Sequence, residues 1–400
     1  MSTFKEYNPM QYLAIDIANN NGLDKESYET RIQWVKDNLD NLENIVPEDP
    51  KTYYLYYKAV RALRAAMRGE ATGHFVALDA VCSGMQIMSA VMGCVKGMAM
   101  TGLVYPDVRT DAYTLVTEAV NKKIPVSVSR KDSKSAVMKH LYGSMAAPKA
   151  VFGDKVEFFF EALREEAPGA MQLFDLLKNS WNEELIYNTW ELPDFHLAHV
   201  PVTETIETRI HVPAIKYTPS VIVEVLNPQD YGVSLIANCV HSVDGYVLRT
   251  LIRRCNYVPR KLKNALKYLK TAYIAKGENE YTRKFKATNI ADLTMVNDVP
   301  PHVISVYPQD MRDALIRIIE MSLSHKPFEI VTIHDSFAAS PVNLNQMRRV
   351  YADIMAELIC STLADDLISQ IRQEDIVVQK FHPDLEAVAR VVSQSNYGIN

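Results

Sequence analysis

The chain has 400 residues, of which 48% are hydrophobic and 23% are charged, and its formal net charge at pH 7 is −5. This composition allows two or three packed units and excludes a disordered or collagen-like chain. No apolar run reaches the roughly 18–20 residues of a membrane span, and the N-terminus shows no secretion signal. The five cysteines are scattered and include no CxxC pair, which is typical of reduced thiols. We therefore expect a cytoplasmic protein that contacts no membrane.

Apolar periodicity predicts a mainly helical chain of the α+β class. The segments expected to be helical are 32–42, 53–68, 85–100, 106–121, 131–144 and 345–367, with further helices up to about residue 178. The segments expected to be β-strands are 75–78, 196–226, which includes a hairpin, and 329–333.

A basic segment lies in the second half of the chain. Residues 253–286 contain eleven Lys or Arg and only two Glu, although the whole chain is acidic. A run of charge commonly forms a solvated helix face, but here its sign opposes that of the chain, so we interpret it as a surface for nucleic acid or a partner. The candidate nucleic-acid-binding residues at its start are Arg253, Arg254, Arg260, Lys261 and Lys263.

The glycines exclude the usual phosphate-binding loops. No two of the 14 glycines are adjacent or one residue apart, so dinucleotide fingerprints and glycine-rich kinase loops are absent. Neither a P-loop nor an HExxH motif occurs. Phosphate chemistry in this chain would therefore depend on side chains and metal ions.

Two aspartates each follow an apolar, β-like run. Asp79 ends FVAL and Asp335 ends EIVTIH. Two such carboxylates from distant parts of a chain can hold a pair of divalent cations about 3.5–4 Å apart, and Mg²⁺ needs few carboxylates beside waters and phosphates. A single aspartate at a strand end is more often a turn or cap residue, so the pair needs a phosphate-binding element nearby.

The segment RKDSKSAVMKHLYGS, residues 130–144, offers that element. On a helix, Arg130, Lys134 and Tyr142 would share a face about 120° wide. The two cations near the helix start can bind a triphosphate, where the helix dipole also favours an anion, and the tyrosine can meet a sugar or base. Together with the aspartates, this spacing is typical of nucleotidyl transfer.

These segments resemble a known family. DAVCSGMQ, RKDSKSAVMKHLYGS and IHDSF resemble motifs A, B and C of the single-subunit, phage-type RNA polymerases, which also serve mitochondria, and NCVHSVDGYVLR resembles a fourth element. A weaker match in NNNGLDKESYETRIQWVKDN aligns Lys25 with a phosphate-contacting lysine. Four motifs in matching order make chance a poor explanation.

The resemblance implies a right-hand nucleotidyltransferase with a small antiparallel palm sheet and helical fingers, in which the N-terminal domain and most of the thumb are missing. The implied division is 1–70, a helical N-terminal part of palm and fingers; 71–105, palm motif A; 106–237, fingers with the motif B helix and a β-rich hairpin region at 196–226; 238–252, a palm element; 253–326, a basic insertion; and 327–400, palm motif C and a C-terminal segment.

The resemblance also implies roles for single residues. Asp79 and Asp335, helped by the main-chain carbonyl of Ala80, would bind two Mg²⁺ ions. Arg130 and Lys134 would bind the triphosphate of an NTP, with Lys134 also placed to protonate the leaving group.

Other implied substrate-binding residues surround the nucleotide. Tyr142 and Gly143 would lie against the incoming nucleotide, Lys25 would contact phosphate, and His241 would contact the 2′-OH. His334 would support the neighbouring aspartate. These roles predict a DNA-directed RNA polymerase that uses a DNA template, single-stranded or melted, and releases RNA.

The resemblance predicts a second polymerase subunit as well. The family carries its thumb, promoter-binding region and a D-x-x-G-R element well before motif A, whereas this sequence has 78 residues before Asp79 and no Gly-Arg dipeptide. We therefore expect a heterodimer of the kind found in some podophages, which are bacteriophages, and hence a location in the host cytoplasm if the protein is viral.

Two alternatives remain at this stage. One is a DNA polymerase with the same palm fold, although such enzymes commonly have H-D-E where this chain has His334-Asp335-Ser336 and a bulky aromatic where it has Met138. The other is a catalytically inactive nucleic-acid-binding subunit, which would be expected to have lost its metal ligands. The residues present favour RNA synthesis.

Overall fold

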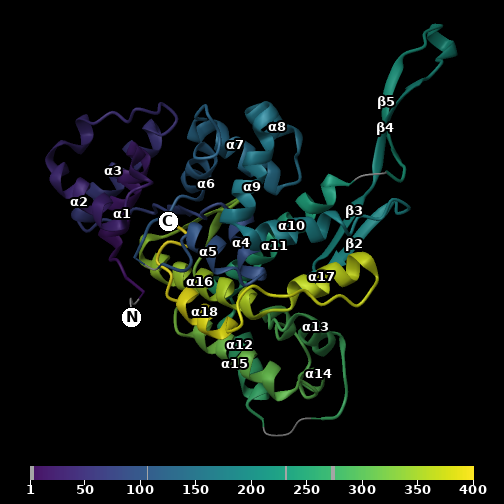
Figure 1. The fold of residues 1–400 in the computed structure, drawn as a ribbon. Helices are drawn as coiled ribbons and strands as arrows, with labels where there is room; N and C mark the ends of the chain where they lie inside the picture. The colour runs from purple at the N-terminus through teal and green to yellow at the C-terminus, as the bar shows by residue number, and fades with distance from the viewer. Residues whose placement is uncertain (1–3, 106, 230–231, 272–274) are drawn as a thin grey trace.

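The computed structural model describes residues 4–105, 107–229, 232–271 and 275–400. It is 56% helix and 10% strand, which confirms the α+β, mainly helical class. Figure 1 shows the helices gathered around short β-strands, with one long β-hairpin projecting from them. No helix in these ranges is both long enough and apolar enough to cross a membrane.

The elements, in chain order, have the following bounds. The helices are α1 Pro9–Ala18, α2 Tyr28–Asp37, α3 Tyr53–Met67, α4 Ser83–Val91, α5 Val95–Met100, α6 Ala112–Asn121, α7 Arg130–Leu141, α8 Ala146–Phe152, α9 Val156–Glu166, α10 Pro168–Lys178, α11 Val233–Cys255, α12 Pro259–Leu269, α13 Glu280–Thr288, α14 Pro301–Ile304, α15 Gln309–Leu323, α16 Leu344–Cys360, α17 Leu363–Arg372 and α18 Leu385–Val392. The strands are β1 Val76–Asp79, β2 Tyr187–Glu191, β3 Leu197–Pro201, β4 Thr203–Arg209, β5 Ser220–Leu226, β6 Val331–Ile333 and β7 Ser336–Ala339.

A three-stranded antiparallel sheet brings the two predicted strand ends together. Its strand order is β1-β7-β6, so β7 pairs with both others. Asp79 of β1 lies opposite Ser336, and Ile333 of β6 lies opposite the same serine. The two residues between Ile333 and Ser336, His334 and Asp335, therefore form a tight hairpin turn. His334 has φ 54°, a conformation that usually requires glycine at this position of a two-residue turn.

The last residues of the chain border the other side of β1. Asp79 and Asn400 exchange two main-chain hydrogen bonds, of 3.2 and 3.0 Å. The buried guanidinium of Arg31 donates to the Asn400 side chain, and Tyr28 donates to the carbonyl of Ile399. These contacts fix the backbone around Asp79 from both sides.

Three predicted helices have different bounds in the structure. The segment 85–100 is divided into α4 and α5, because Gly93 between them has φ +64° and a Cβ there would meet Leu385 at 2.6 Å. The described part of the segment 106–121, which leaves out residue 106, becomes helical only after Asp111, whose carboxylate accepts from the amide of Tyr113. The segment 345–367 breaks at the extended residue Ser361, which separates α16 from α17.

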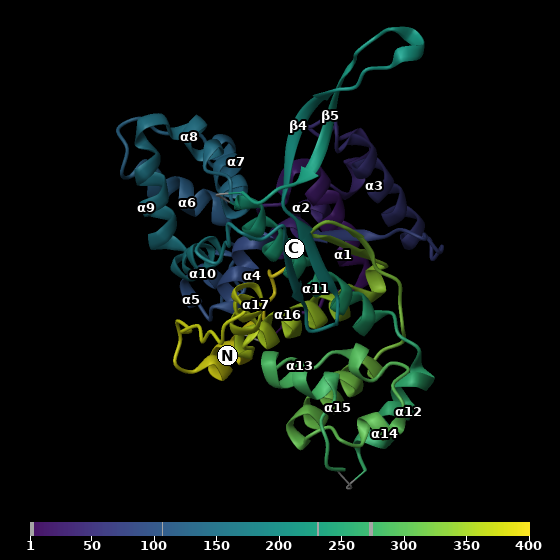
Figure 2. The same cartoon turned by 90° about the vertical axis from the view of Figure 1, so that its right-hand side faces the viewer.

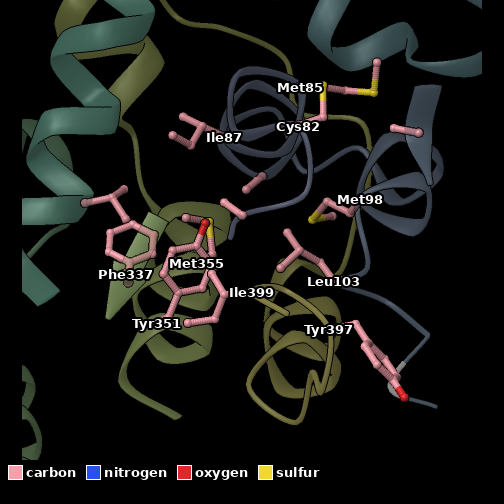
Figure 3. Close-up of a cluster of buried hydrophobic side chains, with 14 of the residues drawn as sticks. Cys82, Met85, Ile87, Met98, Leu103, Phe337, Tyr351, Met355, Tyr397 and Ile399 are labelled. Carbon is pink, nitrogen blue, oxygen red and sulfur yellow. The ribbon is translucent and has the colours of Figure 1, made fainter. Parts of the chain in front are cut away.

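The main core surrounds the three-stranded sheet and α4. In Figure 3, Phe337 of β7 lies beside Tyr351 of α16, and their ring centroids are 5.6 Å apart. The hydroxyl of Tyr351 donates to the buried amide of Gln86 on α4. This packing connects the strand that follows Asp335 with the helix that follows Asp79.

A second cluster of buried hydrophobic residues lies within the predicted basic insertion. It runs from Tyr257 to Ile319 and is formed by α12, α13, α14 and α15. Figures 1 and 2 show these helices together at one end of the molecule. An inserted unit needs a hydrophobic core of its own to fold, and this cluster is such a core. That the segment is an insertion stays a prediction.

The predicted hairpin in the segment 196–226 is formed by β4 and β5. These strands pair from Thr203 with Leu226 to Arg209 with Ser220. Figure 2 shows the hairpin extending well beyond the surrounding helices. Its strands are exposed along nearly their whole length.

Candidate active site

Asp79 and Asp335 line the same cavity, which has a volume of about 990 Å³. The main chain sets their positions, because the amide of Ala80 donates to the carbonyl oxygen of Asp335 at 2.9 Å. The structure thus brings together the two carboxylates that the sequence places at distant strand ends. Ala80, the third expected metal ligand, lines this cavity too.

The electrostatics of this pair favour a bound cation. Burial raises the pKa of Asp335, and the nearby charge of Asp79 raises it further, while His334 and Lys134 act in the opposite direction. Two carboxylates held this way gain from a positive ion between them. Two carboxylates are oxygen donors of the kind that Mg²⁺ takes beside waters and phosphates. The described ranges contain no group of three or more His, Cys, Asp or Glu that could hold a metal ion.

Helix α7 presents its predicted cations to the same cavity. Arg130 and Lys134 both line it. The guanidinium of Arg130 is hydrogen-bonded through Nε to Oδ2 of Asp111 at 2.8 Å, and its Nη2 lies 2.5 Å from the same oxygen. Both cations also lie over the ring of Tyr113, at 5.9 Å for Arg130 and 5.1 Å for Lys134. A half-buried anion and an aromatic face therefore hold the two cations toward the cavity.

Lys25 is the third cation on this cavity. It follows the π-helical turn Asn19–Leu23 and forms an ion pair with its neighbour Asp24. Both side chains are about half exposed, so the pair is weak and can exchange for a phosphate.

Tyr142 does not occupy the position expected from a continuous helix. Helix α7 ends at Leu141, and Tyr142 follows in a non-helical conformation. Its ring stacks on the imidazole of His241, with centroids 4.3 Å apart, rather than lining the cavity beside Arg130. Burial raises the pKa of its hydroxyl to about 12, and Ser83 is hydrogen-bonded to it. Gly143, also expected at the nucleotide, lies next to Tyr142 and outside the cavity lining.

Asp244 is a partly buried carboxyl that the sequence analysis missed. It lies three residues after His241 on α11, within the motif VHSVDG that the resemblance already singled out. Burial, and then the charge of Asp335, raise the pKa of Asp244 to about 6, while a hydrogen bond with Ser83 opposes this. The spacing of three residues on a helix was the available signal, because it places both side chains on one face.

The structure corrects two of the candidate nucleic-acid contacts. Arg254 has no exposed side-chain area, and its guanidinium donates to both carboxylate oxygens of Glu357, at 3.0 and 2.6 Å. Arg253 is mostly buried and forms ion pairs with Asp194 and Asp292. These two arginines neutralise buried acids, so the prediction that they bind nucleic acid is wrong.

The remaining candidates lie on α12 and are exposed. Lys261 forms an ion pair with Asp298 at 2.6 Å, while Arg260 and Lys263 make no ion pair with any described residue. Their binding to nucleic acid stays a prediction.

Comparison with known proteins bears on this site. Residues 6–146 match the family model described as DNA-dependent RNA polymerase, and no curated protein matches the sequence. The matched segment includes every candidate site residue in the first part of the chain, namely Lys25, Asp79, Ala80, Arg130, Lys134, Tyr142 and Gly143. The match covers about a third of the chain and supports its resemblance to the phage-type DNA-dependent RNA polymerases, a family of nucleotidyltransferases.

Proposed function

We propose that this chain is the catalytic subunit of a DNA-directed RNA polymerase that works by two-metal nucleotidyl transfer in a right-hand fold. One observation carries the proposal: Asp79, Asp335, Arg130 and Lys134 line a single cavity, although they come from three distant segments. Carboxylates and cations around one cavity match the two needs of a metal-bound NTP, which are ligands for the metal ions and counter-charges for the phosphates.

The proposed reaction joins the primer 3′-oxygen to the α-phosphorus of the NTP and breaks the bond from that phosphorus to the pyrophosphate. Two Mg²⁺ ions, when held by Asp79, Asp335 and the Ala80 carbonyl, would lower the pKa of the 3′-OH, so that it releases its proton to water, and would stabilise the leaving group. Arg130 neutralises charge on the β- and γ-phosphates. Lys134 lines the same cavity as Arg130 and donates its proton to the leaving oxygen.

A template-directed extension assay tests this function. We expect Asp335→Asn to abolish extension of a primed DNA template with NTPs, because a neutral amide is a poor Mg²⁺ ligand, while template binding survives. Asp49→Asn is the matched control, since Asp49 lines the same cavity but is exposed and lies outside the sheet strands. Wild-type rates in the Asp335 variant, or a preference for dNTPs in the wild type, would contradict the proposal.

A second polypeptide that completes the polymerase is part of this proposal. It is supported by the large apolar side chains that the β4–β5 hairpin leaves exposed, among them Ile215 and Ile222. Exposed apolar surface of this kind is typical of protein interaction sites. Full activity of the isolated chain on a primed template would contradict this part and leave the catalytic assignment intact.

A further inference from the structure

Helix α3 has an aromatic face that the fold does not use. Its buried side consists of Tyr56, Ala59, Val60, Ala62 and Leu63. On the opposite side Tyr53, Tyr54 and Tyr57 are 41%, 79% and 46% exposed. Large aromatic side chains are usually buried in the core or at an interface, so three exposed rings within five residues need an explanation.

The same face is basic. Residues 51–68 contain five Lys or Arg and no Asp or Glu, in a chain whose net charge is −5. Arg64 and Arg68 form ion pairs with Glu43 and Glu70. Lys51, Lys58 and Arg61 are exposed and make no ion pair with any residue that the structure describes. Their charge is therefore available to an anionic partner.

This face begins at the rim of the active-site cavity. Thr52 and Leu55 line the cavity together with Asp79 and Lys134. On a helix, Lys58 and Tyr54 lie about 60° and 100° around the axis from Leu55, in the same direction. Figures 1 and 2 both show α3 across from α6 and α7. A strand leaving the cavity on this side would run over the exposed tyrosines.

We propose that Tyr53, Tyr54 and Tyr57, with Lys51, Lys58 and Arg61, form a binding site for single-stranded nucleic acid at the mouth of the cavity. Unpaired bases stack on exposed aromatic rings whatever their sequence, and neighbouring cations pair with the phosphates. The partner chemistry is an unpaired base on a phosphodiester backbone, which a DNA template and an RNA product share. The direction of the strand toward the cavity rests on the proposed polymerase function, but binding to this face does not.

Fluorescence anisotropy with the full chain and labelled 15-residue oligonucleotides tests the site. We expect the triple variant Tyr53→Ala, Tyr54→Ala, Tyr57→Ala to bind oligo-dT at least about five-fold more weakly, because stacking supplies a large part of the binding free energy. The corresponding triple change to Phe keeps the rings and should bind as the wild type does. A parallel series with oligo-rU identifies the source of the strand: a larger loss for one oligonucleotide assigns the site to template or to product.

The controls separate stacking from charge and from misfolding. Phe158→Ala removes an exposed aromatic of α9 that lies among Glu157, Glu161 and Glu165, and should leave binding unchanged. An abasic oligonucleotide should bind the wild type and the alanine variant equally weakly. Lys58→Gln with Arg61→Gln should lower the slope of log K against log salt by about 0.7 for each lost phosphate contact.

Some outcomes would overturn the inference. Equal binding by the alanine variant and the wild type, or an equal loss in Phe158→Ala, would mean that α3 is not the site. If the wild type extends a primer but α3 variants bind normally, the inference fails and the polymerase function stands. If α3 variants lose binding but the wild type extends no primer even with the second polypeptide present, the function fails and this site stands.

Discussion

The ring of Tyr142 stacks on the imidazole of His241, with centroids 4.3 Å apart and planes 27° from parallel. The hydroxyl of Tyr142 is hydrogen-bonded to Ser83, which also bonds Asp244. Gly84 lies against the same tyrosine, since a Cβ there would be in ordinary van der Waals contact with the Tyr142 hydroxyl, at 3.5 Å. The start of α4, the end of α7 and the middle of α11 are thus joined by polar contacts beside Asp335. We therefore expect a substitution at one of these residues to alter the positions of the others.

The first prediction concerns the choice of sugar. We expect His241→Ala to lower the ratio of kcat/KM for an NTP over the corresponding dNTP by about ten-fold, because one hydrogen bond to the 2′-OH contributes roughly 1–1.5 kcal/mol. Single-nucleotide extension with both substrates measures the ratio. His199→Ala, an exposed histidine on β3 that stacks on Tyr187, is the matched control and should leave the ratio unchanged. An unchanged ratio in His241→Ala would remove this residue from sugar recognition.

The second prediction separates two roles of Asp111. Its carboxylate caps α6 through the Tyr113 amide at 3.1 Å and also holds the guanidinium of Arg130. Asp111→Asn keeps an N-cap but loses the charge, whereas Asp111→Ala loses both. We expect both variants to raise the KM for NTP about three- to ten-fold, because Arg130 is no longer oriented.

Only the alanine variant should lose about 1 kcal/mol in the free energy of unfolding, which denaturant titration measures. A fall in KM would show instead that Asp111 competes with the triphosphate for Arg130.

Much of the candidate site could be predicted from the sequence, because the candidate metal ligands and phosphate-binding cations lie in short segments with fixed spacing. Asp79 and Asp335 could be predicted to lie together because each follows a short apolar run. The antiparallel pairing of β1 with β7 then places Asp79 opposite Ser336, the residue after Asp335. The end of α7 could not be predicted, since the helical period alone does not show that the chain leaves the helix at Leu141. Tyr142 therefore lies against His241, a contact between distant segments.

Charge counted along the sequence was a weaker guide. The segment 253–286 has an excess of Lys and Arg along the sequence. In the folded chain, however, acids from other segments neutralise Arg253 and Arg254, namely Asp194, Asp292 and Glu357. Periodicity predicted helix α3 correctly, but it does not show how many aromatic rings stay on the exposed face of a helix.

The third prediction is a pH dependence of stability from His140 on α7. This side chain packs against Phe159, Phe160 and Phe174, and its Nε2 is buried without a hydrogen-bond partner. Burial lowers the pKa of His140 to about 4. Between about pH 6.5 and 4 the unfolded chain binds a proton that the folded chain does not, so the free energy of unfolding falls as the pH falls. The expected loss across this range is up to about 3 kcal/mol.

The measurement is a comparison of wild type with His140→Leu. Asp244 and Asp353, whose pKa values burial raises to about 6, titrate in the opposite sense in both proteins and cancel in the difference. We expect the leucine variant to gain relative stability steadily as the pH is lowered from 6.5 to 4, as followed by urea titration at each pH. A difference that does not change with pH would mean that His140 is not held neutral by the fold.

The fourth prediction concerns the buried ion pair between Arg254 and Glu357. Glu357→Gln leaves the guanidinium buried without a counter-charge, which should cost about 3–5 kcal/mol in the free energy of unfolding. Arg317→Gln is the matched control, because this exposed arginine contacts the same carboxylate and its loss should cost about 1 kcal/mol or less. If Glu357→Gln does not fold, the double change Arg254→Met, Glu357→Leu should restore folding, since it removes both charges.

The same pair decides which part of the basic run faces nucleic acid. Arg254→Met, combined with Glu357→Leu to preserve folding, should leave the salt dependence of DNA binding unchanged, because the guanidinium has no exposed area. Arg260→Gln with Lys263→Gln should lower that dependence if α12 contacts phosphates. Each lost phosphate contact reduces the number of counterions released when the protein binds DNA. Filter binding at several salt concentrations gives both slopes. Equal slopes in all three proteins would remove the basic run from nucleic-acid binding, and a reduced slope in the Arg254 variant would contradict the buried position of its charge.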